Sequence, residues 1–379
     1  MTEFVFYLSL FLILYTYLGY PLFLLIVSRF VNRPVIRGNI LPSVTIVIPV
    51  HNEENQIRAK IENCLKIDYP KDELKIIVAS DYSTDRTEDI VKEFESEQLQ
   101  FLQLPFRGGK VAAQNYAVRF GESDIFVFTD VAIRIDQDCI KLIVQNFHDG
   151  DIGVVSCRDV VIGDNDRKEG ERSYINYDML VRKYTSQIGS IIGVTGGFYA
   201  VRKEVAQGGW NPAFPPDFYV ALRSIKRGMR VVEDSRVKAY YKTAAEEWDE
   251  LTRKARTINR GMRALFWNRG LLNPFKYGLI SLELASHKLF RWMTPFFFLL
   301  LFFSNLIILK ESVFAIWFFI IQLCFYSLVI ISVLVKKEAS DRFFRKLPSF
   351  FLVVNLAILK AWVEFIIGKK YVIWEPTKR

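Results

Sequence analysis

Residues 124–136, DIFVFTDVAIRID, place a threonine and a carboxylate directly after a short apolar run. The run 125–128 is typical of a buried strand, and Thr129 and Asp130 stand where that strand would end. Ligands of open α/β sheets bind beyond the carboxyl ends of the strands. An aspartate there can hold a divalent cation against a diphosphate, because hard cations prefer carboxylate and phosphate oxygens. An ordinary turn has the same letters, so the neighbouring sequence has to separate the two interpretations.

Apolar runs and helical segments alternate on both sides of this stretch. Residues 44–49, VTIVIP, predict a strand that ends at a proline, and residues 51–66 predict the helix that follows. Runs at 74–79 and 99–104 predict two more strands, and a Gly-Gly-Lys sequence at 108–110 opens another helix. Strands that alternate with helices predict a parallel, doubly wound sheet. Downstream, strands are expected at 152–158, 194–201, 231–233 and 237–241, and helices at 88–94, 173–187, 217–227 and 246–263.

The composition indicates membrane contact and argues against several other classes of protein. Of the 379 residues, 51% are hydrophobic and 15% are aromatic, and the excess lies at the two ends of the chain. The formal net charge is +9, but many basic residues flank the hydrophobic segments, where they suit anionic lipid headgroups. No basic helix with interleaved aromatic residues points to nucleic acid as a partner. The 4 cysteines form no CxxC pair and the 3 histidines are far apart, which argues against zinc and suits a cytoplasmic catalytic part.

Three long uncharged runs predict membrane helices. Residues 4–28 lack charged side chains and are long enough to cross a bilayer with some tilt. Residues 292–309 and 312–335 are separated only by Lys310 and Glu311, so they are expected to form a helical hairpin across the bilayer. Basic residues follow the first run and the hairpin, and this bias places both of these ends in the cytoplasm.

These patterns divide the chain into six regions. The last hydrophobic helix, 347–368, has two interpretations. As a further span it would leave the basic tail outside, against the charge rule, whereas an interfacial or re-entrant helix would keep the tail inside. The predicted regions are an N-terminal transmembrane helix (1–30), a linker (31–43), an α/β domain (44–268), an interfacial helix region (269–291), a C-terminal membrane region of two spans and a third hydrophobic helix (292–368), and a basic tail (369–379).

Carboxylates recur at the ends of the predicted strands. Glu53 follows the first strand, Asp81 the second and Asp130 the fourth. Each can accept hydrogen bonds from a nucleobase or a ribose hydroxyl, or hold Mg²⁺ or Mn²⁺, and each also fits a helix cap or a turn. Lys110 follows two glycines, so it either meets a phosphate or is solvated. Because these groups recur along one edge of the predicted sheet, a nucleotide site there is the favoured interpretation.

Six motifs in a fixed order closely resemble those of membrane-bound family 2 glycosyltransferases. They are VTIVIPVHNEE, IIVASDYSTDRT, GGK, IFVFTD, TGGFYAVR and PPDFYVALRSIKRGMRV, and they extend over about residues 44–263. The family consists of inverting enzymes of GT-A fold, which include cellulose and hyaluronan synthases and many exopolysaccharide glycosyltransferases. The resemblance implies an α/β fold of GT-A type that binds a nucleotide-sugar on a mostly parallel sheet, with transmembrane helices at both ends of the chain.

The resemblance also implies a role for each matching residue. Asp217 stands at the place of the catalytic base, although it fits a helix N-cap as well. Asp130 matches the first aspartate of the DxD motif, which holds the metal and the sugar diphosphate. The implied nucleotide-sugar-binding residues are Pro49, His51, Asn52, Glu53, Asp81, Lys110 and Asp130. The implied diphosphate and acceptor residues are Gly196, Gly197, Arg202, Arg253 and Arg256, of which the last two also fit a solvated helix face.

The sequence departs from the family pattern at several positions. Ala132 replaces the second DxD carboxylate, so metal binding would rest on Asp130. The usual DDGS run is SDYS here, with Ser80 at its first position. Pro216 precedes Asp217 where an acidic residue is common, and Arg256 is followed by Thr257 instead of the tryptophan that accompanies processive synthesis.

The expected function is transfer of a sugar from a nucleotide donor, expected to be a UDP-sugar, to a saccharide or lipid-linked acceptor in polysaccharide or cell-envelope glycan synthesis. Asp217 would take the proton of the acceptor hydroxyl in one inverting displacement. The resemblance implies a multi-pass protein of the cell membrane with a cytoplasmic catalytic domain, a Mg²⁺ or Mn²⁺ cofactor and polysaccharide-export partners. The alternative is a degenerate nucleotide-sugar-binding protein that scaffolds or regulates export, which Ala132 and Thr257 favour.

Overall fold

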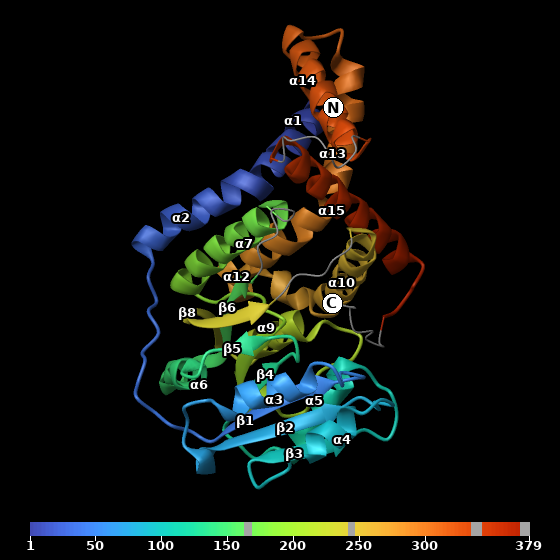
Figure 1. Cartoon of the computed structure of the whole chain (residues 1–379). Coiled ribbons are helices and arrows are strands. Elements are labelled where there is room, and N and C mark those ends of the chain that lie inside the picture. The colour runs from blue at the N-terminus through green and yellow to red at the C-terminus, as the bar shows by residue number, and fades with distance from the viewer. Residues whose placement is uncertain (163–168, 242–246, 335–342, 372–379) are drawn as a thin grey trace.

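The computed structural model describes residues 1–162, 169–241, 247–334 and 343–371. An α/β domain lies at one end of the molecule, and long helices from both ends of the chain gather at the other (Figure 1). The described strands form one mixed sheet in the order β3-β2-β1-β4-β7-β6-β8-β5. Their bounds are β1 Val44–Val50, β2 Leu74–Ser80, β3 Leu99–Gln103, β4 Ile125–Thr129, β5 Arg134–Ile135, β6 Ile152–Val161, β7 Phe198–Arg202 and β8 Arg230–Tyr241.

The first four strands of this order run parallel, as the alternation of strands and helices predicts. Strands β1 and β4 are buried along their whole length, because helices cover both faces of this part of the sheet. The fifth strand, β7, runs antiparallel to β4 and to β6, while β6 and β8 pair in parallel. The sheet is therefore mostly parallel but mixed, and the predicted fold class is confirmed.

Helices enclose two buried apolar layers, one on each face of the sheet. One layer takes side chains from α3 and α6, and the other from α5, α9 and α10. The helices of this domain are α3 Ile57–Leu65, α4 Thr87–Lys92, α5 Lys110–Phe120, α6 Cys139–Val144, α7 Glu169–Ile188, α8 Lys203–Ala206, α9 Pro216–Lys226 and α10 Glu247–Trp267, with 3₁₀ turns η2 Lys71–Glu73, η3 Gln145–His148 and η5 Arg269–Leu272.

Some boundaries differ from the sequence-based prediction. The helix expected from residue 51 begins at Ile57, because the residues before it are held in a hydrogen-bonded loop. The strand expected from residue 194 begins at Phe198, and the two short strands expected after residue 230 form the single strand β8. The two-residue strand β5 was not predicted, since its pairing with β8 depends on tertiary packing.

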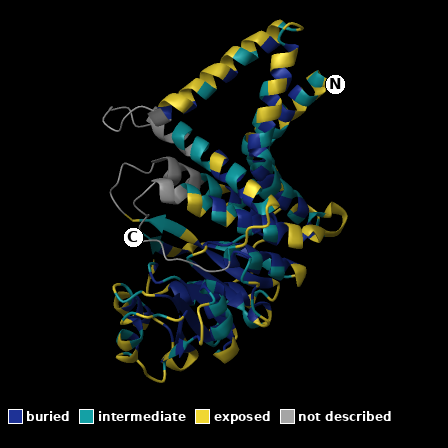
Figure 2. Cartoon of the chain, turned by 90° about the vertical axis from the view of Figure 1, so that its right-hand side faces the viewer, coloured by how far each residue is buried: buried dark blue, intermediate teal, exposed yellow. Residues whose placement is uncertain are grey.

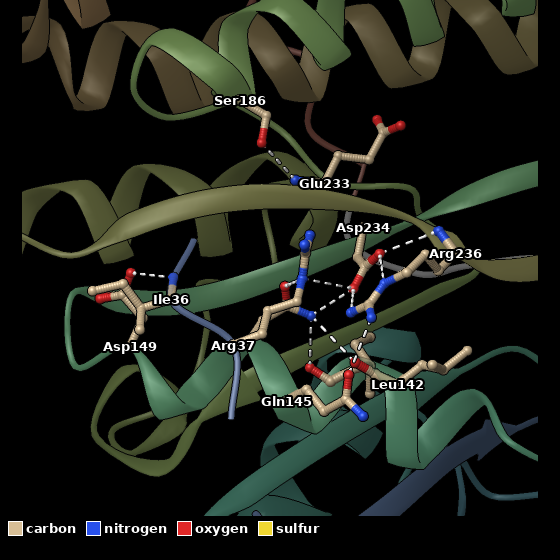
Figure 3. Close-up of polar contacts among 11 residues, drawn as sticks. Ile36, Arg37, Leu142, Gln145, Asp149, Ser186, Glu233, Asp234 and Arg236 are labelled. Carbon is tan, nitrogen blue, oxygen red and sulfur yellow. Dashed lines mark hydrogen bonds and ion pairs between the residues drawn. The ribbon is translucent and has the colours of Figure 1, made fainter. Parts of the chain in front are cut away.

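The predicted linker, 31–43, runs down one side of the molecule from α2 to β1 (Figure 1) and contacts the α/β domain through hydrogen bonds to Gln145 and Asn146. The Arg37 Nε lies 3.7 Å from the buried Asp234 carboxylate, which also accepts hydrogen bonds from Arg236 and Asn146 (Figure 3). Burial alone would raise the pKa of Asp234, but these hydrogen bonds lower it below its usual range. The backbone N–H of Ile36 donates to Asp149 over 3.3 Å. The linker therefore fixes the first helix relative to the domain.

Three described helices are long and apolar enough to cross a membrane: Thr2–Phe30, Leu279–Ile308 and Val313–Ser332. Their outer surfaces carry many exposed apolar side chains (Figure 2). The second helix runs without a break through residue 291, where the sequence predicted a boundary between an interfacial helix and a span. The short helix α11 Pro274–Tyr277 comes directly before α12. The elements in the three segments are α1 Thr2–Leu14, η1 Tyr15–Gly19, α2 Tyr20–Phe30, α12 Leu279–Glu283, η6 Leu284–Leu289, α13 Phe290–Ile308 and α14 Val313–Leu334.

The last helix, α15 Phe343–Ile366, packs along α10 of the α/β domain. Its buried residues Ala357, Ile358 and Ala361 belong to the apolar layer that also contains α10. The Asn259 side-chain amide donates to the Ala361 carbonyl over 3.4 Å. One face of this helix is therefore committed to the domain, and within the described residues the helix is not among the three candidate spans.

Candidate active site

The loops after β1, β2 and β4 meet at one edge of the sheet. Because β1 lies between β2 and β4 and is parallel to both, the carboxyl ends of the three strands point the same way. Pro49 is a member of β1 and pairs with Ala79 of β2. The His51 ring nitrogen Nδ1 lies 2.8 Å from the Asp81 carbonyl oxygen, which joins the first two loops. The edge predicted from the sequence is thus where the polar loops gather.

Asn52 and Glu53 brace the first loop against the second. The Asn52 side-chain oxygen accepts a hydrogen bond from the Thr84 backbone over 2.8 Å. The backbone N–H groups of Asn52 and Glu53 donate to the hydroxyls of Ser83 and Thr87. These contacts use backbone groups that a longer helix would have satisfied internally, so α3 starts later than the sequence pattern predicted.

Asp81 holds the loop after β3 in place. Its side chain is 1% exposed, and its two carboxylate oxygens accept hydrogen bonds from the backbone N–H groups of Gly108 and Gly109 over 2.6 and 2.8 Å. Gly109 has a φ of 84°, a conformation that glycine adopts at little cost. Asp81 therefore positions the Gly-Gly turn that presents Lys110 at the start of α5.

Lys110 and Asp130 form an ion pair at the centre of this edge. The Lys110 ammonium lies 2.5 Å from the Asp130 carboxylate and donates to the Gly196 carbonyl over 3.3 Å. The Asp130 backbone N–H donates to the Gly197 carbonyl over 3.0 Å. The Lys110 side chain is 14% exposed and that of Asp130 is 33% exposed, so a ligand can reach the pair. Both predicted glycines are thus brought against the predicted phosphate-binding residues.

Lys60 supports the turn that carries Asp130, and the sequence analysis missed it. Its ammonium donates to the Thr129 hydroxyl over 2.8 Å and to the Ile133 carbonyl over 2.6 Å. The residue is 2% exposed, and this burial lowers the pKa of its ammonium. A lysine among the apolar positions Ile57 and Ile61 of a predicted helix was the signal that could have identified it.

Asp217 lies at the start of α9, beside the loop that contains Gly196 and Gly197 and precedes β7. A Cβ atom placed on Gly196 would lie 3.9 Å from the Asp217 Oδ2 atom, and the Asp217 carbonyl accepts a hydrogen bond from the Val194 N–H over 3.1 Å. The N-cap of α9 is Pro215, and its first turn has no side-chain cap hydrogen bond. The Asp217 carboxylate is half-buried and faces the same loop as Lys110, so the N-cap interpretation does not hold.

Arg260 is a second functional residue that the sequence analysis missed. Its guanidinium donates to the carbonyls of Phe214 and Pro212 over 2.6 and 3.1 Å, which fixes the loop that leads to Asp217. Burial lowers the pKa of Arg260 to about 10, a fall that the Asp217 carboxylate opposes and the Arg256 charge adds to. Arg256 precedes Arg260 by one turn of α10, which places that predicted residue near the site.

Arg253 is exposed on the same helix, one turn before Arg256. Its backbone carbonyl accepts a hydrogen bond from the Thr257 hydroxyl over 3.0 Å. The structure therefore places Arg256 nearer than Arg253 to the residues around Asp217, and leaves Arg253 with the solvated position that the sequence also allowed.

Asp159 adds a third carboxylate near the site. Strand β6 pairs with β7 up to Ser156, so Asp159 lies further along β6, beside the loop that precedes β7. Burial raises the pKa of Asp159 to about 6, and the nearby charges of Asp130 and Asp217 act in the same direction. The Arg182 guanidinium opposes this rise. The sequence offered little signal for Asp159, because the predicted strand ended at residue 158 and Asp159 follows the charged Arg158.

The prediction for Arg202 is wrong. Because β7 runs antiparallel to β4, Arg202 pairs with Ile125 at the amino end of β4, on the opposite edge of the sheet. Its guanidinium donates to the backbone carbonyls of Phe147, Asp149 and Ile152 over 2.8 to 3.2 Å. Arg202 therefore stabilises the far side of the domain and does not reach the diphosphate or the acceptor.

The residues present fit a divalent cation that is shared with a substrate. Within the described part of the chain, no three His, Cys, Asp or Glu side chains gather as a metal site. Asp130 supplies one accessible carboxylate, and Ala132 supplies none. Mg²⁺ commonly binds through one or two carboxylates and keeps its other positions for substrate phosphates and water. Asp130 would hold such an ion together with the donor diphosphate.

The order and directions of the strands form a mostly parallel, mixed sheet of the GT-A type. Residues 45–210 match the model of the family Glycosyl transferase family 2. The chain therefore carries a glycosyltransferase family 2 domain, and the resemblance found in the sequence is confirmed.

The chain is similar to three curated proteins over about half of its length. "Probable glycosyltransferase YdaM" of Bacillus subtilis (strain 168) is 31% identical over 53% of this chain and 51% of that protein. "Beta-monoglucosyldiacylglycerol synthase" of Nostoc sp. is 26% identical over 45% of this chain and 38% of that protein. "Poly-beta-1,6-N-acetyl-D-glucosamine synthase" of Staphylococcus aureus (strain MSSA476) is 26% identical over 53% and 50%. The chain thus spans about half the length or less of these relatives.

Among solved structures, the chain is similar in fold to the mannosyltransferase PcManGT from Pyrobaculum calidifontis, solved in complex with GDP-Man and Mn²⁺. The TM-score is 0.69 at 18% sequence identity, and the match covers 97% of this chain and 100% of that one. The likeness therefore extends beyond the α/β domain to the helices at both ends.

Proposed function

We propose that this protein is a membrane-bound inverting glycosyltransferase. It transfers a sugar from a nucleoside-diphosphate donor to a hydroxyl of a saccharide or lipid-linked acceptor, with Asp217 as the general base. The observation that carries the proposal is the meeting of Lys110, Asp130 and Asp217 at Gly196. Lys110 bonds to the Gly196 carbonyl, and a Cβ on the same glycine would lie 3.9 Å from the Asp217 carboxylate. The proposed diphosphate-binding group and the proposed base thus both lie next to one glycine.

In this mechanism the acceptor oxygen attacks the anomeric carbon of the donor sugar. The bond between that carbon and the diphosphate oxygen breaks, and the nucleoside diphosphate leaves with both bonding electrons. The proton of the acceptor hydroxyl passes to Asp217, because a positioned carboxylate can act as a general base. A single displacement inverts the anomeric centre, so an α-linked donor gives a β-linked product.

The departing diphosphate is stabilised by positive charge on its other side. When the donor binds, the Lys110 ammonium leaves Asp130 and binds the phosphate oxygens. Arg256 adds a second positive charge from α10. A divalent cation held by Asp130 supplies electrostatic stabilisation of the diphosphate when it is bound. Arg260 keeps the loop before Asp217 in place through the Phe214 carbonyl.

The relatives' names support a glycan or a lipid as the acceptor, because one is a glucosyldiacylglycerol synthase and another a polysaccharide synthase. The three apolar helices support an acceptor at the membrane surface. The basic residues that follow the first span support a cytoplasmic catalytic face, where nucleotide-sugars are made.

Replacing the proposed base tests the mechanism directly. Asp217→Asn is expected to lower sugar transfer by about 10²–10⁴-fold, because it removes the proton acceptor but keeps the shape of the side chain. Affinity for the nucleoside diphosphate should stay within about twofold. Transfer is measured with radiolabelled nucleotide-sugars on purified membranes, and binding by titration calorimetry on the purified protein.

Asp138→Asn serves as the matched control, since Asp138 is exposed and forms no cap hydrogen bond at α6. Full transfer by the Asp217→Asn variant would remove Asp217 from the mechanism. Nucleotide binding by the wild-type protein without turnover of any donor would instead support the scaffolding alternative.

A further inference from the structure

Tyr82 has a backbone conformation that tyrosine rarely adopts. Its φ is 57°, and among the described residues only Asn52 shares a positive φ without being glycine. Asparagine tolerates the left-handed region, because its short polar side chain bonds locally, whereas a bulky side chain there is strained. Glycine would satisfy this turn at a lower conformational cost. A tyrosine therefore occupies a position whose backbone conformation favours glycine.

Hydrogen bonds hold the residues on both sides of Tyr82. Before it, the Asp81 N–H donates to the Val50 carbonyl over 2.8 Å. After it, the Ser83 N–H donates to the Ser80 hydroxyl over 3.1 Å, and the Thr84 N–H donates to the Asn52 side chain over 2.8 Å. Both ends of the turn are thus fixed, and strain of this kind persists where the surroundings impose it and often marks a functional position.

Packing does not explain the Tyr82 side chain, because Tyr82 is 47% exposed. A second exposed aromatic residue, Phe106, borders the same place and is 68% exposed. The Asp81 carboxylate bonds to the Gly108 N–H, and the Phe106 ring lies 3.7 Å from the position of a Cβ on Gly108. The Phe106 ring therefore lies beside the Asp81–Gly108 contact, and Tyr82 is the residue that directly follows Asp81.

We propose that Tyr82 and Phe106 form the stacking surface for the nucleobase of the donor. The inference rests on the proposed function, because it requires a nucleotide in this site. Aromatic rings bind nucleobases through their π faces, and exposed rings held by rigid loops do so at little entropic cost. Lys110 lies two residues after Gly108, and Asp130 lies directly after the end of β4. A nucleotide with its diphosphate on that pair would direct its base toward the loops of Tyr82 and Phe106.

The test combines stability with binding, because the two readouts should move in opposite directions. Tyr82→Gly is expected to raise the unfolding midpoint by roughly 2–4 °C by relieving the backbone strain. The same substitution should weaken binding of UDP or GDP by about tenfold through loss of stacking. Binding of inorganic pyrophosphate with Mn²⁺, which has no base, should stay unchanged. Tyr82→Asn should behave similarly, and Tyr82→Phe should match the wild-type protein in both readouts.

A Tyr82→Gly variant with unchanged affinity for UDP and GDP would overturn the inference while leaving the proposed function intact. Equal weakening of nucleotide and pyrophosphate binding would also overturn it, since that result would mean a distorted loop. Phe106→Ala provides the second arm, and it should weaken nucleotide binding without raising the unfolding midpoint. Failure of the wild-type protein to bind either nucleotide would overturn the proposed function together with this inference.

Discussion

Two half-buried carboxylates, Asp159 on β6 and Glu233 on β8, lie near the Arg182 guanidinium, which also pairs with Asp178. Arg182 donates to Asp178 over 2.8 Å and to the Gly193 carbonyl over 3.2 Å. Among the described residues, the Glu233 Oε2 atom has no hydrogen-bond partner. The single positive charge of Arg182 therefore lies near three carboxylates, those of Asp159, Asp178 and Glu233. Burial raises the pKa of Glu233 to about 7.

Glu233 makes the stability of the protein depend on pH. Its pKa in the folded state, about 7, lies above the ordinary value of 4.5, so the folded protein binds the proton more tightly than the unfolded chain. The resulting stabilisation is complete below about pH 4.5 and is lost as the pH rises through 7. Glu233→Gln should weaken this dependence and unfold at a higher temperature than the wild-type protein at pH 8.

Thermal unfolding in detergent between pH 5 and 8 checks this expectation. Asp159 contributes a loss in the same direction, so a weaker dependence remains in the variant. Glu97→Gln is the control, because Glu97 is exposed. Parallel curves for the wild-type protein and the Glu233→Gln variant would contradict the assignment.

At the level of elements, the turn after β4 is held between three neighbours. Lys60 bonds to it from α3, Lys110 pairs with it from α5, and the loop before β7 receives the Asp130 N–H. Gly197 allows that loop to approach, since a Cβ there would lie 2.7 Å from the Ile133 Cδ1 atom. The close approach of two backbones thus depends on one missing side chain.

Gly197→Ala should therefore displace the Ile133 side chain and loosen the turn. We expect a loss of roughly 1–3 kcal/mol in the free energy of unfolding and weaker binding of the nucleoside diphosphate. Ile133→Val removes the atom that makes the closest contact, so the double variant should recover part of both losses. Denaturant unfolding and nucleotide titration measure the effects.

Gly189→Ala is the matched control, because a Cβ atom placed on Gly189 would have no other atom within 4 Å. Additive losses in the double variant would show that Ile133 and position 197 do not interact.

At the scale of the whole molecule, the α/β domain is joined to the helices by several separate contacts. Tyr20 and Leu24 of α2 pack against Val181 and Ile188 of α7. On the other side, α15 lies along α10. The sheet and the long apolar helices thus form one connected body, with exposed apolar side chains on the helices (Figure 2).

The orientation of this body in the membrane can be tested with cysteines. In a Cys324→Ser background, where the three remaining cysteines are buried, Glu311→Cys marks the turn between α13 and α14 and Glu97→Cys marks the α/β domain. An impermeant maleimide should label Glu311→Cys in intact cells, and Glu97→Cys only after permeabilisation. The opposite pattern would contradict a cytoplasmic catalytic face.

Local patterns in the sequence were sufficient for the strands β1–β4, the start of α5 and the three apolar helices. Continuous apolar runs that end in polar residues specify buried parallel strands, because helices must cover both of their faces. Carboxylates at the ends of these strands then had to meet at one edge. Pro49, His51, Asn52, Glu53, Asp81, Lys110 and Asp130 lie along this edge for this reason. Gly196, Gly197 and Asp217 reach the same edge through the loop that precedes the antiparallel β7. The roles of all these residues in catalysis and binding stay predictions.

Other residues acquired their positions only through tertiary packing. Arg202 lies on the edge opposite to the predicted one, because β7 is antiparallel to β4 and the sequence does not reveal this direction. Lys60 and Arg260 act on backbone carbonyls far away in the chain, and no spacing rule connects them to those partners. The left-handed Tyr82 likewise lies between hydrogen bonds that its neighbours make to β1, to the loop after β1 and within their own loop. Local patterns record which face of an element is buried, whereas the direction of a strand and the partner of a buried charge depend on how the elements pack.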